Sequence, residues 1–86
     1  NGEGKTVVAA FSGAPKSGSP PLAVNFTDLS SGTVTAWSWT FGDSGTSTTT
    51  NPSHTYQAIG NYTVSLEVSG ADGSDTEVKS DYISVR

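Results

Sequence analysis

The chain has 86 residues, the size of one small domain. Its net charge is −4, and its four basic residues are scattered along the sequence, which excludes the clustered basic surface that nucleic acids and anionic membranes require. There is no cysteine for a disulfide or a thiolate metal site. There is also no apolar run of about 18 residues, so membrane insertion is not expected.

In chain order, residues 1–6 have the composition of a linker, and residues 7–86 form the expected domain. Abundant Thr, Val and aromatic residues favour strands, and Gly, Ser, Asn and Asp favour the turns between them. Seven strands are predicted, at 7–12, 22–27, 34–41, 46–50, 52–56, 62–68 and 76–85. Between them lie a proline-rich loop at 14–21, a corner at 57–61 and a hairpin turn at 70–73. No window has a helical period, so these signals indicate a seven-stranded antiparallel immunoglobulin-like sandwich.

The aromatic residues of the third predicted strand organise this fold. Trp37, Trp39 and Phe41 alternate with Ser38 and Thr40, so the three aromatic side chains share one face of the strand. Each aromatic side chain buries about 150–250 Å² in a core, which makes this face the expected nucleus. Trp39 stands where an immunoglobulin-like fold buries a tryptophan.

Further core positions follow from the same architecture. Phe26 and Val64 stand where antibody domains place their bridging cysteines, so apolar contact replaces the disulfide here. Tyr62 lies two positions before Val64, where a tyrosine corner is expected. The predicted core is therefore Phe26, Trp39, Phe41, Tyr62, Val64 and Leu66.

Two irregular features are also predicted from local pattern. Strand 46–50 is polar throughout, which places it at a sheet edge. Tyr82 sits directly beside the inward-facing Ile83, which breaks the alternation and indicates a bulge near Ser80 and Asp81.

No enzymatic activity is predicted. Residues 42–45 spell the block around the nucleophile of trypsin-like proteases, but the only histidine, His54, follows Ser44, whereas in those enzymes the nucleophile comes last. We therefore interpret residues 42–45 as a β-turn. A lone histidine does not make a zinc site, so His54 is interpreted as a partly buried ring that fixes the loop before Tyr56.

Trp37 is the one candidate binding residue, and two interpretations are open. It lies nearer the start of its strand than Trp39, where a sandwich thins. Either it packs into the core, or it is a rim aromatic that stacks on a sugar ring or a proline-rich fibre. Two sequons, at Asn25 and Asn61, are candidate glycosylation sites, whereas proline excludes Asn51.

Three blocks carry a recognisable pattern, at 39–43 (WTFGD), 51–56 (NPSHTY) and 60–68 (GNYTVSLEV). These blocks and their spacing resemble the PKD (polycystic kidney disease) domain, and the resemblance runs from about Val8 to Val85. There are two departures from the family pattern. Thr40 stands where the family usually has Asp, and Ser44 stands where the family usually has Gly, so a turn one residue longer is expected there.

The resemblance implies a non-catalytic extracellular module. The first interpretation is a spacing, adhesion or protein–protein contact module of a cell-surface, surface-layer-type protein, whose partners are neighbouring domains, other surface proteins or polymers. The alternative is an accessory domain of a secreted hydrolase that contacts collagen or a polysaccharide. No metal site or cofactor is predicted, but some family members bind calcium. The candidate ligands would then be Asp28, Asp43, Asp72, Asp75 and Asp81.

Overall fold

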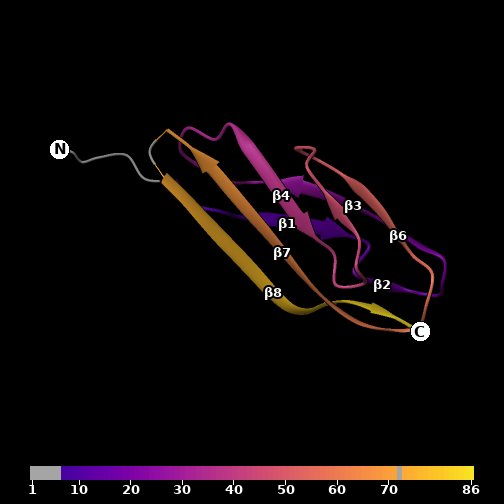
Figure 1. Cartoon of the computed structure of the whole chain (residues 1–86). Helices are drawn as coiled ribbons and strands as arrows, with labels where there is room; N and C mark the ends of the chain where they lie inside the picture. The colour runs from indigo at the N-terminus through magenta and orange to yellow at the C-terminus, as the bar shows by residue number, and fades with distance from the viewer. Residues whose placement is uncertain (1–6, 72) are drawn as a thin grey trace.

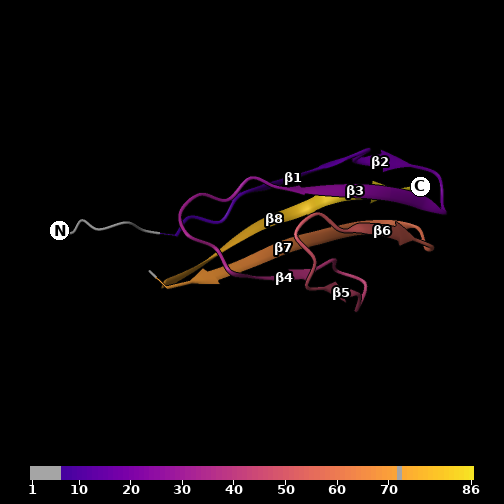
Figure 2. The same cartoon turned by 90° about the horizontal axis from the view of Figure 1, so that it is seen from above.

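The computed structural model describes residues 7–71 and 73–86, and it consists of two packed β-sheets (Figures 1 and 2). One sheet has three strands in the order β1-β3-β6, and the other has five in the order β2-β8-β7-β4-β5. The described residues form no helix, and hence none that could cross a membrane. The strands are β1 (Phe11–Ala14), β2 (Ser17–Gly18), β3 (Leu22–Asp28), β4 (Ala36–Thr40), β5 (Thr46–Ser47), β6 (Ser53–Tyr56), β7 (Gly60–Gly70) and β8 (Gly73–Val85).

The predicted all-β sandwich is confirmed, but the number of strands and one pairing differ. Eight strands form instead of seven, because β2 lies inside the segment predicted to be a proline-rich loop. It pairs with the end of β8 in parallel, whereas every other pair of strands is antiparallel. The prolines flank this pairing without interrupting it, since Ser84 N donates to Lys16 O and Arg86 N donates to Gly18 O.

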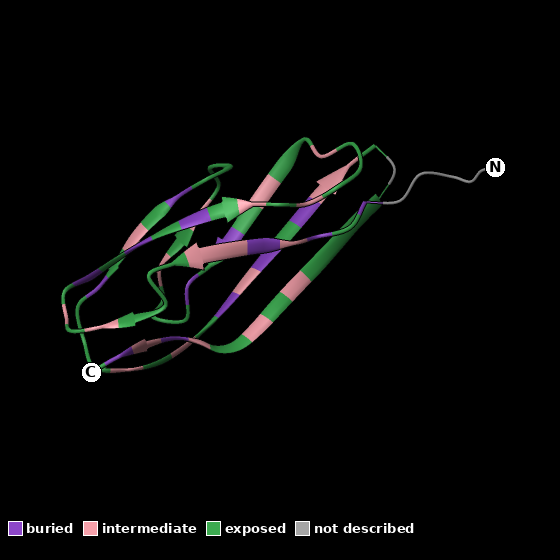
Figure 3. Cartoon of the chain, turned by 180° about the vertical axis from the view of Figure 1, so that it is seen from behind, coloured by how far each residue is buried: buried purple, intermediate pink, exposed green. Residues whose placement is uncertain are grey.

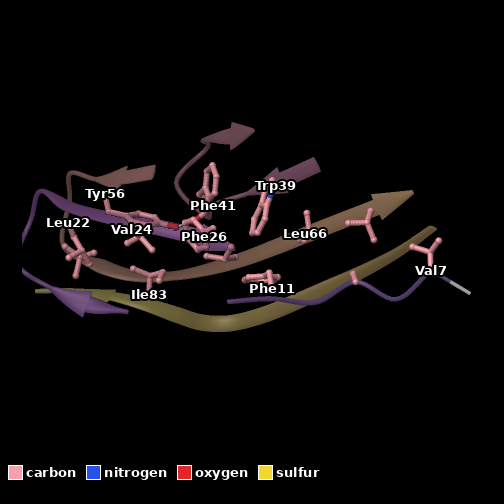
Figure 4. Close-up of a cluster of buried hydrophobic side chains, with 14 residues drawn as sticks. Val7, Phe11, Leu22, Val24, Phe26, Trp39, Phe41, Tyr56, Leu66 and Ile83 are labelled. Atoms are coloured by element: carbon pink, nitrogen blue, oxygen red, sulfur yellow. The ribbon is translucent and has the colours of Figure 1, made fainter. Parts of the chain in front are cut away.

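The core lies between the two sheets, and strand alternation builds it. Buried residues occupy every second position along most of β3 and through the middle of β7 (Figure 3). Trp39 is fully buried, with its ring centroid 5.2 Å from that of Phe11 and 5.5 Å from that of Phe26 (Figure 4). The buried apolar residues are Val7, Ala9, Phe11, Leu22, Val24, Phe26, Trp39, Phe41, Tyr56, Val64, Leu66, Val68, Ile83 and Val85.

The hairpin of β7 and β8 carries the predicted bulge. Gly70 pairs with Gly73 at its tip, where the hairpin turn was expected, although Asp72 lies outside the described residues. The register shifts between Tyr62 and Val64, opposite residues 80–82 of β8. Asp81 has a φ of 49°, and its N–H donates to Thr63 Oγ1 at 3.2 Å. This irregularity lets Ile83 face the core although Tyr82 is only half-buried.

Tyr62 has the geometry of a tyrosine corner. Its hydroxyl donates to Ala58 O, four residues upstream, at 2.6 Å, and its ring centroid lies 4.4 Å from that of Tyr56. The side chain is half-buried and packs against the core instead of lying within it, so the expectation that Tyr62 is a core residue needs this correction. The other five predicted core residues are all buried.

Candidate functional site

Trp37 and Trp39 project from the same side of β4 but reach different environments. The three-stranded sheet covers Trp39, whose indole N–H donates to Thr49 O at 2.8 Å. Trp37 is half-buried, and its N–H donates to Asp28 Oδ2 at 3.0 Å. Asp28 is the last residue of β3, so Trp37 lies where the covering sheet ends. Its ring packs against the core, as the packing interpretation expects. It also has solvent-accessible surface, as a rim aromatic would.

The carboxylate that holds Trp37 is itself fixed by its neighbours. Asp28 Oδ1 accepts the N–H of Ser30 at 3.0 Å, and the N–H of Asp28 donates to Asn51 Oδ1 at 2.8 Å. The indole therefore has little rotational freedom, although part of its surface is accessible. A rigid aromatic surface of this kind loses little conformational entropy when it binds a partner. The role of Trp37 as a contact residue remains a prediction.

A second cluster joins Asp43 and His54, which no sequence motif links. His54 Nε2 lies 2.7 Å from Asp43 Oδ2, and the imidazole stacks on Phe41 with ring centroids 4.3 Å apart. Asp43 Oδ1 also accepts the N–H of Gly45 at 3.0 Å, which closes the β4–β5 turn. His54 is thus partly buried as expected, but it fixes the 42–45 turn instead of a loop before Tyr56. The pair connects β6 of one sheet to the β4–β5 turn of the other.

Ionisation in this cluster follows from its contacts. Burial opposes ionisation of Asp43, but the hydrogen bonds from His54 and from the Gly45 N–H outweigh it and lower the pKa of this carboxyl below its ordinary value of 3.8. Burial, with smaller contributions from Asp43 and Tyr62, raises the pKa of the Tyr56 phenol. Tyr56 therefore stays protonated and donates to Phe41 O at 2.8 Å.

This cluster lacks the arrangement that nucleophilic catalysis requires. Ser44 lies in the exposed turn with a φ of 77°, and His54 Nε2 is hydrogen-bonded to Asp43. A catalytic histidine would instead offer this nitrogen to the serine. The described residues also enclose no pocket that would hold a substrate. The arrangement therefore serves to hold the turn.

The carboxylates considered as calcium ligands lie apart in the described structure. Asp28 and Asp43 accept hydrogen bonds from the backbone N–H groups of Ser30 and Gly45. Asp75 Oδ2 accepts the N–H of Ala9 at 2.8 Å. Asp81 lies at the bulge, and Asp72 lies outside the described residues. No group of three or more metal-binding side chains forms within residues 7–71 and 73–86. The described carboxylates therefore do not fit the six to eight oxygens that calcium usually takes.

The two sequon asparagines are both exposed on strands. Asn25 lies in β3, where its Oδ1 accepts the hydroxyl of Ser53 at 2.6 Å. Asn61 lies in β7, opposite Ser84. Their glycosylation stays a prediction.

Three known proteins are similar to this chain in sequence or in structure. The chain is 35% identical over 77 residues to Collagenase ColA from Bacillus cereus, covering 85% of this chain and 8% of the collagenase. The PKD1 domain of the metalloprotease PrtV from Vibrio cholerae is 30% identical, with a TM-score of 0.78 over 93% of this chain and 99% of that domain. A structure of carbohydrate-binding modules from the β-sandwich superfamily is 26% identical, with a TM-score of 0.83 over 98% of this chain and 36% of that one.

A sequence model of one protein family also matches this chain, and it agrees with the fold and with these similar proteins. That model describes the PKD domain and covers residues 6–85, which includes all eight strands. The chain therefore belongs to the PKD domain family, and it is a non-catalytic β-sandwich module.

Proposed function

We propose that this PKD domain is an accessory module of a secreted hydrolase and holds the enzyme against an extracellular polymer, collagen or a polysaccharide. The observation that carries the proposal is the likeness to modules of a collagenase and of a metalloprotease. The chain spans only 8% of that collagenase, so any catalytic activity would belong to other parts of such a protein. The surface-layer interpretation of the sequence has no comparable support among these relatives.

Trp37 is the residue proposed to make the contact. Its indole is held by Asp28, it keeps accessible surface at the end of the covering sheet, and it presents a flat amphipathic ring. A sugar ring or a proline-rich fibre offers the matching flat, weakly polar surface. Binding of this kind needs no pocket, which is consistent with the closed surface of the described residues.

A spacer role is the second candidate, and the positions of the chain ends favour it. The described chain begins at one end of the elongated sandwich, and Arg86 lies at the opposite end (Figure 1). A domain that a chain enters and leaves at opposite ends separates its neighbours by its own length. The partners of this role are the adjoining domains of the same chain.

Adsorption to insoluble polymers tests the proposed function. We expect the protein to adsorb saturably to fibrous collagen or chitin, and Trp37→Ala to reduce retention by about ten-fold, the loss of one aromatic contact of roughly 1.4 kcal/mol. Trp37→Phe should retain part of the binding because it keeps a flat ring. Ile59→Ala is the matched control, since Ile59 is 72% exposed and lies outside the site.

The melting temperature of each variant separates binding from stability. If Trp37→Ala lowers the melting temperature but adsorbs as well as the unchanged protein, Trp37 is a packing residue and the contact proposal is wrong. If the unchanged protein adsorbs to neither polymer, the spacer role is favoured instead.

A further inference from the structure

Two basic residues that lie far apart in the sequence converge in the structure on one aromatic ring. Two of the three basic residues that the structure describes, Lys16 and Lys79, reach Tyr82. Their Nζ atoms lie 5.6 Å and 5.5 Å from the centroid of that ring. Both distances are within the cation–π range of about 6 Å. A chain with a net charge of −4 therefore has a local concentration of positive charge.

The surroundings of Tyr82 leave its hydroxyl available as a donor. Tyr82 Oη accepts the N–H of Gly13 at 2.9 Å, and no acceptor for its own proton lies among the described residues. The ring also packs edge-on against Phe11, with centroids 5.7 Å apart, which fixes its position. An anionic oxygen placed here would receive the phenolic proton in a hydrogen bond, beside a ring that two ammonium groups approach.

We propose that Lys16, Lys79 and Tyr82 bind the acidic group of an anionic polysaccharide. The ligand chemistry is a sulfate or a carboxylate on a sugar, recognised by two ammonium groups and one phenolic hydroxyl. This site is separate from Trp37 and goes beyond the proposed function. A polysaccharide suits it because it is flexible and repeats its charges, so it can bring an acidic group to an exposed β-sheet edge that has no pocket.

Neighbouring acidic residues limit the strength of this site. Glu77 Oε2 lies 3.5 Å from Lys79 Nζ and partly neutralises it, and the exposed Asp81 is adjacent to Tyr82 in the chain. Asp75 faces the same side of β8 but accepts the Ala9 N–H. The overall negative charge also opposes the approach of a polyanion, so binding depends on the two lysines and weakens as salt is added.

Affinity electrophoresis in gels containing heparin, polygalacturonate or neutral dextran tests the site. At low salt we expect retardation by an acidic polymer and none by dextran. Heparin alone would identify a sulfate ligand, and polygalacturonate a carboxylate. Lys16→Met and Lys79→Met keep the aliphatic stems and should each weaken binding by about two- to five-fold, the range of one exposed ion pair. Glu77→Gln should strengthen binding, because it releases Lys79.

Arg86→Met is the matched control, since it removes the same charge away from Tyr82, and it should bind like the unchanged protein. Trp37→Ala should also keep this binding, which separates the site from the proposed polymer contact. The proposal is overturned if neither acidic polymer retards the protein at low salt. It is also overturned if the two lysine variants, with unchanged melting temperatures, bind no more weakly than Arg86→Met.

Discussion

The N–H of Gly13 in β1 donates to the hydroxyl oxygen of Tyr82 in β8 at 2.9 Å, although these strands belong to different sheets. Four residues earlier in the chain, the N–H of Ala9 donates to Asp75 Oδ2 in the same way. Side chains of β8 therefore satisfy one backbone donor of β1 and one of the segment just before it. An edge protected like this is a poor template for pairing with another chain.

Tyr82→Phe tests the contribution of this hydrogen bond, because it removes the hydroxyl that accepts the Gly13 N–H and keeps the ring. We expect a loss of about 1 kcal/mol in the free energy of unfolding, as a partly buried N–H loses its partner. Hydrogen exchange should accelerate at the Gly13 amide and stay unchanged at Leu29, whose N–H donates to Ala10 O at 2.8 Å. Unchanged exchange at Gly13 would show that water or another group replaces the hydroxyl.

The sequence predicts the sandwich well because its core depends on local alternation. Trp39 and Val64 are buried where the period of two places them, and the adjacent Tyr82 and Ile83 reveal the bulge. The strand β2 could not be predicted in this way, because two residues between prolines carry no alternation. Its pairing depends on the end of β8, which is more than 60 residues away in the chain, since Ser17 pairs with Ser84.

The contacts within the candidate sites could not be predicted from the sequence, because they also depend on how distant strands meet in the fold. Asp43 and His54 meet because Phe41 and Tyr56 bring two strand ends together, and no motif records that pairing. The place of Trp37 on its strand identifies it as a candidate, but its contact with Asp28 depends on where β3 ends. Lys16 and Lys79 are scattered in sequence and converge only through the parallel pairing of β2 with β8.

Ser44→Gly is expected to stabilise the protein. Ser44 has a φ of 77°, in the left-handed region, at the position where the PKD pattern usually has glycine. This conformation costs a non-glycine residue about 1–2 kcal/mol, and the greater freedom of glycine in the unfolded chain offsets about 0.5–1 kcal/mol of the gain. The expected net increase in the free energy of unfolding is about 0.5–1 kcal/mol, measured by urea denaturation.

Gly42→Ala in the same turn is the matched opposite change. Gly42 has a φ of 91°, and a methyl group there would lie 2.6 Å from Thr63 O, so this variant should be strongly destabilised. If Ser44→Gly lowers the stability instead, the serine hydroxyl contributes more than the backbone conformation costs.

Asp43 should make the stability depend on pH in the acidic range. Because folding lowers the pKa of this carboxyl below 3.8, the folded state favours the ionised form. Its contribution is then fully present above the pKa of the unfolded chain and is lost as the pH falls through the folded pKa. Protonation removes the negative partner of His54, and it weakens the hydrogen bond from the Gly45 N–H.

Asp43→Asn isolates this contribution, because the amide keeps an oxygen acceptor but never ionises. At about pH 7 the variant should unfold at a lower urea concentration than the unchanged protein, and the difference should shrink once the pH falls below 3.8. Glu67→Gln, an exposed change on β7, controls for net charge and should show little difference at either pH. The difference in unfolding urea concentration between Asp43→Asn and the unchanged protein could instead stay constant from about pH 7 to about pH 2.5. The shape of the Asp43 side chain, and not its charge, would then hold His54 and the turn.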